Sequence, residues 1–283
     1  MPPVTIVIAT RNRRRALLAT LGRLRELPER PRVVVVDDAS EDGTAAAVRE
    51  RFADVDAVEQ RRQGGQAAAR NLGVRSASTP LIAFCDDDSW FEPGALARAA
   101  GAFEREPRLG LAGARILVEP DAQLDPTSAA MAHSPLGRIR SLDAPRVLGF
   151  LACGAVLRRR AFVEVGGFNP HFSGGGEERL LAIDLARADW KAAYLDDVVA
   201  RHAPEPGGRD ERRRSVLRNE LWTAWLRRPA GAALRRSAVL LASADPRIAL
   251  AAAVEAARGL RWVVDARSPV AAQLHRAIAL TDP

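Results

Sequence analysis

The sequence has a single lysine, Lys191, and only two cysteines, Cys85 and Cys153. Both cysteines lie in apolar strand-like runs, so we interpret them as core residues and expect neither a disulfide framework nor a zinc site. No apolar run reaches the roughly 18 residues that cross a bilayer, and the N-terminus lacks the basic and apolar regions of a secretory signal. We therefore expect a soluble, cytoplasmic protein, whose 283 residues suffice for one large core and a second, smaller unit.

The net positive charge lies entirely at the end of the chain. Thirteen arginines and six acids follow Asp210, and thirteen minus six equals the net charge of +7. A neutral body with a basic end predicts contact with something anionic, such as a membrane surface or a lipid-linked phosphate. We expect no nucleic-acid partner, because no zinc-finger or aromatic RNA-binding signature accompanies the charge. The alternative is a basic face that is simply solvated.

Strand and helix patterns alternate in the first half of the chain. The strongest strand patterns cover residues 4–10, 32–40, 80–88 and 109–118, and a weaker one covers 55–60. Helical patterns lie between them, over 17–24, from about 42, over 64–77 and over 93–106, where Pro93 suits a first turn. This order predicts an α/β fold with a mostly parallel central sheet and helices on both faces.

The second half becomes increasingly helical. Strands are predicted at 150–157 and 192–202, a helix at 177–188, and a long surface loop over 119–145. Pro229 and Pro246 divide the nearly all-helical end into about three pieces. We therefore predict a domain over 1–206 and a basic helical region over 207–283. The arginine pairs 213–214, 227–228 and 235–236 are expected to lie outside its core.

Polar residues follow the three strongest strands. They are Thr10 to Arg13 after the first, Asp37 to Ser40 after the second, and Asp86 to Asp88 after the third. Ligands of open parallel sheets collect at the carboxyl ends of the strands, where these residues lie. Three consecutive acids repel one another unless a cation neutralises them, and carboxylate oxygens suit Mg²⁺ or Mn²⁺. A solvated acidic turn is the alternative to such a metal site.

Six motifs occur in order along the chain: IVIATRNR, VVVVDDASEDGT, GGQAAARNLG, IAFCDDDSW, GAVLRRRAFVEVGGFNP and GGGEERL. Over residues 4–202 the sequence thereby resembles the family-2 glycosyltransferases of the GT-A fold. The resemblance implies transfer of a sugar from a UDP- or dTDP-linked donor to an acceptor hydroxyl, with inversion and with Mg²⁺ or Mn²⁺. It also implies a Rossmann-like, nucleotide-sugar-binding half over 1–118 and an acceptor and catalytic half over 119–206.

The resemblance assigns residues to three parts of a site. The metal ligands are Asp88 and Asp86, and His202 is a third candidate, although a lone histidine is more often structural. Trp90 and Gly154 belong to the acceptor side. We interpret Ser40 and Asp42 as turn and helix-cap residues. The nucleotide-binding residues are Thr10, Arg11, Asn12, Asp38, Gly65, Arg70, Asn71, Asp86 and Asp87.

An inverting transfer needs a base that takes the proton from the acceptor hydroxyl. The family usually has Glu-Asp after a glycine, and the matching segment here is Gly176-Glu177-Glu178. Glu178 therefore takes the position of the base and Glu177 that of its neighbour, with a side chain one methylene longer than the usual aspartate. Asp184 lies close to two helical turns beyond Glu178 and is the second candidate. An ordinary charged helix face is the alternative for all three.

Other functions remain as alternatives. The Glu-Glu pair leaves open a catalytically inert nucleotide-sugar-binding or scaffold protein. A different nucleotide-using enzyme on a similar α/β plan, such as a nucleotidyltransferase or a dehydrogenase, ranks last. Dinucleotide and Walker-type phosphate sites lack support, because no G-x-G-x-x-G follows the first strand and no G-x-x-x-x-G-K-[ST] occurs. The acceptor is left open as a glycan, a lipid-linked molecule or a small molecule, and peripheral contact with the inner face of an anionic membrane is left open with it.

Overall fold

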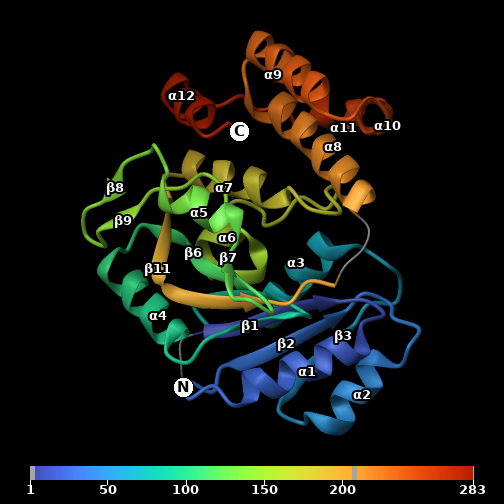
Figure 1. Cartoon of the computed structure of the whole chain (residues 1–283), viewed down its shortest axis with the longest axis vertical. Coiled ribbons are helices and arrows are strands. Elements are labelled where there is room, and N and C mark those ends of the chain that lie inside the picture. The colour runs from blue at the N-terminus through green and yellow to red at the C-terminus, as the bar shows by residue number, and fades with distance from the viewer. Residues whose placement is uncertain (1–3, 206–208, 283) are drawn as a thin grey trace.

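A mixed, mostly parallel sheet forms the centre of the computed structural model, which describes residues 4–205 and 209–282 (Figure 1). Its strand order is β3-β2-β1-β4-β10-β6-β11-β5, with β7 beside β6. Strands β3, β2, β1 and β4 are parallel, as are β6 and β11, whereas β10 runs antiparallel to β4 and β6. The predicted fold class is confirmed. The strands are β1 Val4–Thr10, β2 Arg32–Asp37, β3 Val55–Glu59, β4 Leu81–Asp86, β5 Ser89–Phe91, β6 Leu109–Val118, β7 Gln123–Leu124, β10 Ala155–Arg158 and β11 Lys191–His202.

Helices cover both faces of the sheet because successive side chains of a strand point to opposite faces. In β1, Ile6 and Ile8 belong to the core under α1 (Arg14–Arg25), α2 (Thr44–Arg51) and α4 (Ala95–Arg105). Val7 and Ala9 belong to the opposite core. That second core includes residues of α3 (Gln66–Ser76), α6 (Arg159–Glu164) and α7 (Glu177–Arg187). The uninterrupted apolar runs of the sequence are therefore strands that are buried on both sides.

The segment 119–145 is more structured than the predicted surface loop. It contains α5 (Pro126–Ala132), the strand β7 and a hairpin of β8 (Arg138–Ile139) and β9 (Ala144–Pro145). The Asp125 side chain accepts the N–H of Thr127, and Pro126 occupies the first turn of α5. Asp followed by Pro is a signal for the start of a helix, although the Pro-, Ser- and Asp-rich composition of the segment is typical of a loop. Pro93 lies before α4, whose N-cap is Gly94. A 3₁₀ turn, Ala152–Gly154, precedes β10.

The C-terminal region packs on α7, on the side away from β2 and β3 (Figure 1). The described part has five helices instead of the predicted three. The breaks at Pro229 and Pro246 are confirmed, and a further break follows α10 at Gly259. The predicted boundary at 206–207 lies outside the described residues. The helices are α8 Arg209–Arg227, α9 Ala230–Ser243, α10 Pro246–Arg258, α11 Leu260–Asp265 and α12 Ala272–Leu280.

Three arginines of the predicted outer pairs are not on the outside. Arg227 lies 2.5 Å from Asp184, Arg228 lies 2.5 Å from Asp282, and the Arg236 side chain is only 7% exposed. The prediction was wrong because these arginines meet carboxylates between the helices. None of the helices in the described ranges is long and apolar enough to cross a membrane.

Close packing of α3 on the sheet generates a prediction about stability. A Cβ on Gly73 would lie 2.3 Å from Val7 Cγ1 and 3.3 Å from Val36 Cγ2, in a fully buried layer. We expect Gly73→Ala to lower the free energy of unfolding by about 1 to 3 kcal/mol, because the helix must move off β1. Urea denaturation followed by circular dichroism measures this change.

Gly22 in α1 is the matched control, since a Cβ there would meet no atom within 4 Å. Gly22→Ala should be neutral or stabilising by up to about 1 kcal/mol, because alanine is the better helix former. Equal unfolding midpoints for the two variants would contradict the packing argument.

Candidate active site

The carboxyl ends of β1, β2, β4 and β11 meet at a cavity of about 360 Å³. Parallel pairing brings the ends of β1, β2 and β4 to one edge, and β11 adds its last residue to the same wall. Most of the residues predicted to bind nucleotide and metal therefore share one place. The cavity is lined by Ala9, Thr10, Arg11, Arg13, Asp38, Gln66, Ala69, Asp86, Asp87, Asp88, His202, Pro204, Glu205 and Arg212.

The acidic turn that follows β4 is held by its backbone. The Ser89 hydroxyl accepts the N–H of Asp86 at 2.8 Å and donates to the carbonyl of Cys153 at 2.8 Å. From the other side, the Thr20 hydroxyl donates to the carbonyl of Asp87 at 2.8 Å. Because these bonds use buried side chains of neighbouring elements, the three carboxylates are presented from a fixed turn.

One arginine joins three carboxylates across the cavity. Arg13 Nε lies 2.6 Å from Asp87 Oδ1, Nη2 lies 2.6 Å from Asp88 Oδ2, and Nη1 lies 3.0 Å from Glu205 Oε2. The guanidinium therefore offsets the repulsion between adjacent acids. Arg13 was not singled out from the sequence, because arginine is so common here that one more after a strand carried little information. Its only signal was its place within the polar run after β1.

Burial acts most strongly on the middle acid. It raises the pKa of Asp87 to about 6, while the charge of Arg13 and a hydrogen bond donated by Thr10 at 2.8 Å lower it. The Asp88 charge adds to the rise. A carboxylate so far from water depends on nearby cations to stay ionised.

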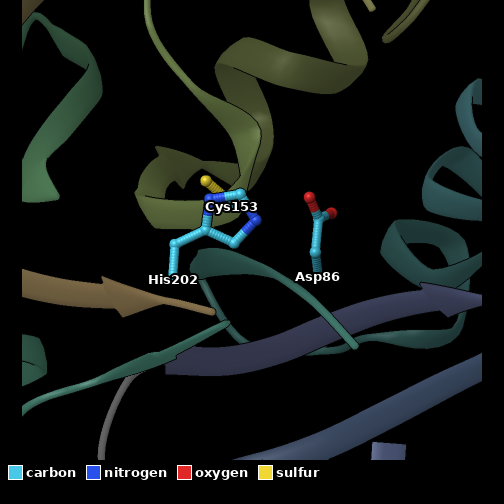
Figure 2. Close-up of side chains that lie close together, drawn as sticks. All are labelled: Asp86, Cys153 and His202. Atoms are coloured by element: carbon cyan, nitrogen blue, oxygen red, sulfur yellow. The ribbon is translucent and has the colours of Figure 1, made fainter. Parts of the chain in front are cut away.

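His202 lies beside the acids. The ligand atoms of Asp86, Cys153 and His202 are all within 4.8 Å of one another (Figure 2), and His202 Nε2 is 3.3 Å from Asp88 Oδ1. Burial alone would lower the pKa of His202. The hydrogen bond to Asp88 and the charges of Asp88 and Asp86 outweigh this effect, and the pKa is raised above its ordinary value.

This donor set fits a hard divalent cation. Carboxylate oxygens of Asp86 and Asp88 with an imidazole nitrogen of His202 are ligands that Mn²⁺ accepts, and the oxygens also suit Mg²⁺. Burial raises the pKa of Cys153 well above its ordinary value, so its sulfur stays a neutral thiol and is not a ligand for such an ion.

The loops after β1 and β2 are tied to each other and to α3. Both oxygens of Asp38 accept backbone N–H groups, from Gly64 at 2.6 Å and Gly65 at 2.9 Å. Gly65 has φ +83°, which favours glycine, at the start of α3. Asn12 accepts the N–H of Glu41 at 2.8 Å and donates its own to the Ser40 hydroxyl at 2.9 Å. Asn12 and Asp38 therefore shape the wall through backbone contacts.

Asp42 was predicted to cap a helix, but the N-cap of α2 is Gly43 and Asp42 lies one residue before it. Its carboxylate accepts the backbone N–H of Thr44 at 3.0 Å, at the start of α2, and that of Arg14 at 3.1 Å. Ser40 has its turn role, because its N–H donates to Asp37 at 2.8 Å.

A buried arginine connects the acidic turn to α7. Arg70 is 2% exposed, with Nη2 2.6 Å from Asp86 Oδ1 and Nη1 2.9 Å from Glu177 Oε1. The two negative partners raise its pKa despite its burial. Within the described residues, the second carboxylate oxygen of Glu177 is buried without a hydrogen-bond partner. Arg70 therefore lies behind the cavity, as a bridge between two carboxylates.

Glu178 differs from its neighbour. It is half-buried, and its Oε2 accepts the backbone N–H of Gly176 at 3.1 Å. Burial, and then the charge of Glu177, raise the pKa of Glu178 to about 7, against the opposing charge of Arg70. Glu178 therefore has a carboxyl group that can change its protonation near neutral pH.

Two predicted residues are used elsewhere in the fold. The Asn71 amide donates to the carbonyl of Phe168 at 2.7 Å and accepts its N–H at 2.9 Å, so it fastens the GGFNP turn and does not face the nucleotide wall. Asp184 accepts two hydrogen bonds from Arg227 of α8, at 2.5 and 2.8 Å. The structure does not bring Asp184 to the cavity, because α7 turns that carboxylate towards α8.

The two residues predicted on the acceptor side also lie outside the cavity lining. Trp90 is half-buried against the α1–α4 core, with the Arg23 guanidinium 3.6 Å from its ring centroid. Gly154 is buried, and a Cβ there would lie 3.0 Å from both Ala200 Cβ and Ile116 Cγ1. Close packing of the 3₁₀ turn on β6 and β11 accounts for this glycine.

Comparison with known proteins places the chain in a family. The model of Glycosyl transferase family 2 matches residues 5–166, which is more than half of the chain. The pre-mycofactocin glycosyltransferase of Mycobacterium tuberculosis is 29% identical over 208 residues, which are 70% of this chain and 42% of that protein. The chain thus spans about two fifths of the length of the first curated relatives that it matches.

Two further proteins align over most of the chain. The N-acetylglucosaminyl-diphospho-decaprenol L-rhamnosyltransferase of M. tuberculosis is 25% identical over 243 residues, covering 74% of this chain and 78% of that protein. Mannosyltransferase PcManGT from Pyrobaculum calidifontis, solved in complex with GDP-Man and Mn²⁺, superposes with a TM-score of 0.63 at 21% identity. That alignment covers 99% of this chain and 86% of PcManGT, and it shows a shared fold. The chain belongs to glycosyl transferase family 2 and has the GT-A fold.

Proposed function

We propose that the chain is a nucleotide-sugar-dependent glycosyltransferase that moves a sugar from a UDP- or dTDP-linked donor to an acceptor hydroxyl with inversion. The observation that carries the proposal is the gathering of three carboxylates and an imidazole at the cavity, linked through Arg70 to the start of α7. Family membership supports the reaction class. In this proposal residues 1–206 form the catalytic domain and 207–283 a separate helical unit.

The proposed nucleotide wall consists of Thr10, Arg11, Asp38 and the loop before α3. Each Asp38 oxygen accepts one N–H and retains a lone pair, so it can accept a further bond from a pyrimidine N–H. Arg11 is exposed on the wall, where its charge would attract phosphate. A Cβ on Gly65 would meet nothing within 4 Å, which leaves the approach to this loop open.

We propose Asp88, Asp86 and His202 as ligands of Mg²⁺ or Mn²⁺. A cation bound there supplies Lewis-acid stabilisation of the departing diphosphate. Within the chain, Arg13 and Arg70 offset the repulsion between the carboxylates, because each guanidinium donates to a different edge of the acidic turn. The Mn²⁺ present with GDP-Man in PcManGT supports a divalent cation on this fold.

Glu178 is the proposed general base. Its carboxylate takes the proton of the acceptor hydroxyl while that oxygen forms a bond to the anomeric carbon, and the bond from that carbon to the diphosphate oxygen breaks. A pKa near 7 suits this role at neutral pH, since the group is then partly ionised and is a stronger base than an ordinary carboxylate. Glu177 is less suited, because Arg70 already holds it.

The acceptor is proposed to be a glycan, a lipid-linked molecule or a small molecule. The aligned rhamnosyltransferase of M. tuberculosis carries a diphospho-decaprenol in its name, and this supports the lipid-linked class. Such an acceptor would bring the enzyme to a membrane surface.

Exposed side chains of the C-terminal helices support peripheral contact with an anionic membrane. Of the nine exposed large apolar side chains in the described residues, seven lie in α9–α12. On α10, Arg247, Leu250, Val254 and Arg258 are exposed at helical spacing, so apolar and basic groups share one face. Like charges oppose self-association through this face, whereas anionic lipid complements it.

The metal assignment predicts that Asp88→Ala abolishes cation-dependent binding of nucleoside diphosphate and leaves the fold intact. The turn is held by backbone bonds that do not involve the Asp88 side chain. Calorimetric titration with UDP and dTDP, with and without Mn²⁺, measures the loss. Asp56→Ala, which removes a carboxylate 51% exposed on β3, is the control and should bind as the parent does. Unchanged Mn²⁺-dependent affinity in Asp88→Ala would refute the assignment.

The base assignment predicts that Glu178→Gln retains donor binding but loses transfer by a factor on the order of 10² or more. Glu177→Gln should have a milder effect. In the parent, transfer should fall as the pH drops through about 7, because the raised pKa of Glu178 means that protonation removes the base there. Initial rates of transfer, measured with a panel of sugar nucleotides, test both expectations. A parent protein that binds a donor but transfers no sugar would instead support the catalytically inert nucleotide-sugar-binding protein.

Asp184→Asn separates the two candidate bases. It removes a carboxylate that is already paired with Arg227, so we expect a loss of stability and little loss of transfer per folded molecule. Full transfer in Glu178→Gln together with none in Asp184→Asn would reverse the assignment.

The membrane proposal predicts sedimentation of the chain with anionic vesicles but not with neutral ones, and release at high salt. Each basic residue near such a surface contributes about 1 kcal/mol, which salt screens. Leu250→Gln with Val254→Gln should weaken binding. Leu124→Gln, at an exposed leucine of β7, should not. Equal recovery in the supernatant with both vesicle types would end the proposal without affecting the transferase assignment.

A further inference from the structure

The loop that precedes the two glutamates cannot hold its own position. Gly174, Gly175 and Gly176 have φ values of +78°, +101° and +88°, all in the left-handed region that favours glycine. Three successive glycines have no side chains with which to anchor the backbone. Their conformation therefore has to be maintained by a neighbouring element.

That element is α8. A Cβ on Gly174 would lie 2.7 Å from Ser215 Cβ, and one on Gly176 would lie 3.4 Å from Asn219 Cβ, so the helix packs directly on the loop backbone. The Asn219 amide is fully buried and donates to two loop carbonyls, of Ser173 at 3.1 Å and Gly175 at 2.6 Å. It uses both of its amide hydrogens in this way.

Arg218 strengthens the same contact. Its Nη2 donates to the carbonyl of Ser173 at 2.8 Å and to the hydroxyl of that residue at 3.1 Å, while its Nε donates to Asn219 Oδ1 at 3.1 Å. A salt bridge of 3.1 Å to Glu255 of α10 fixes the guanidinium. The donor groups of α8 are thus oriented before they meet the loop.

A single peptide group connects this contact to Glu178. The carbonyl of Gly175 accepts from Asn219, and the N–H of the same peptide, on Gly176, donates to Glu178 Oε2 at 3.1 Å. Because the peptide is planar, the bond from Asn219 sets the direction of the N–H that meets the carboxylate. We propose that Asn219, supported by Arg218, is a positioning residue that orients Glu178 for proton transfer. The inference rests on the proposed role of Glu178 as the base.

The test replaces Asn219 by aspartate, which has the same shape but donates no hydrogen bond. Hydrogen–deuterium exchange of the full chain should rise at residues 174–178 in Asn219→Asp. The kcat for transfer should fall at least tenfold, while KM for the donor and the Kd for UDP with Mn²⁺ stay within about twofold. Thr223→Val is the matched control one turn further along α8, because its buried hydroxyl has no hydrogen-bond partner in the described residues. It should change none of these quantities.

Two outcomes overturn the proposal. Unchanged exchange at 174–178 in a folded Asn219→Asp means that α8 does not hold the loop, whether or not transfer is measured. Raised exchange with unchanged kcat means that the loop does not orient the base. Should the aspartate variant fail to fold, Asn219→Ser takes its place, because serine keeps a shorter donor. It should raise exchange at 174–178 and lower kcat by smaller amounts, again with little change in KM for the donor or in the Kd for UDP. Full activity in Glu178→Gln, measured in parallel, would instead identify the proposed base as the error.

Discussion

The buried bridge from Asp86 through Arg70 to Glu177 is the interaction on which the rest of the site depends. Arg70 and Glu177 are each 2% exposed, and a charge buried to this degree is strongly destabilising once its partner is removed. The bridge therefore couples the end of β4 to the start of α7, which lie 91 residues apart in the sequence. It joins the turn that carries the three acids to the helix that carries Glu178.

The balance of charge around the bridge constrains what the cavity can bind. The cavity lining, the Arg70 bridge and Glu178 together hold seven carboxyl groups against four guanidinium groups. The carboxyl groups are those of Asp38, Asp86, Asp87, Asp88, Glu177, Glu178 and Glu205, and the guanidinium groups are those of Arg11, Arg13, Arg70 and Arg212. Negative charge is therefore in excess even after every ion pair is counted. Burial and then the charge of Glu177 raise the pKa of Glu178, whereas the pKa of His202 is raised by Asp88 and Asp86 against the effect of burial. A diphosphate approaching this edge would be repelled unless a cation accompanied it, which is the physical reason for expecting binding to depend on metal.

Local pattern and parallel topology made the sheet and its polar edge predictable from the sequence. The apolar strand-like runs and the turn residues beside them located β1, β2, β4 and β6 to within a few residues. Because parallel strands end at the same edge of the sheet, Thr10, Asp38 and the acidic turn then meet at one cavity. The partner that each polar side chain chooses could not be predicted in this way. Asn71 bonds to Phe168, which is 97 residues away, and Asp184 bonds to Arg227, which is 43 residues away. Partners so distant in the sequence become neighbours only when the chain folds. Arg13 could not be singled out either, since arginine is common in this sequence and the three carboxylates come together only in the folded chain.

Several arginines of the C-terminal region are buried in ion pairs and are not surface groups. Arg227 and Arg228 looked like surface groups, yet each meets a carboxylate between helices, because the planar guanidinium can be buried when its donors are matched. Other arginines of the region stay exposed, and two of them, Arg247 and Arg258, lie beside Leu250 on α10. The same helix carries Glu255, which fixes Arg218 and, through it, the contact of α8 with the glycine loop. Helix α10 therefore takes part in both proposals. Its exposed arginines belong to the surface proposed to meet lipid, and its Glu255 holds Arg218, which supports the contact proposed to orient Glu178.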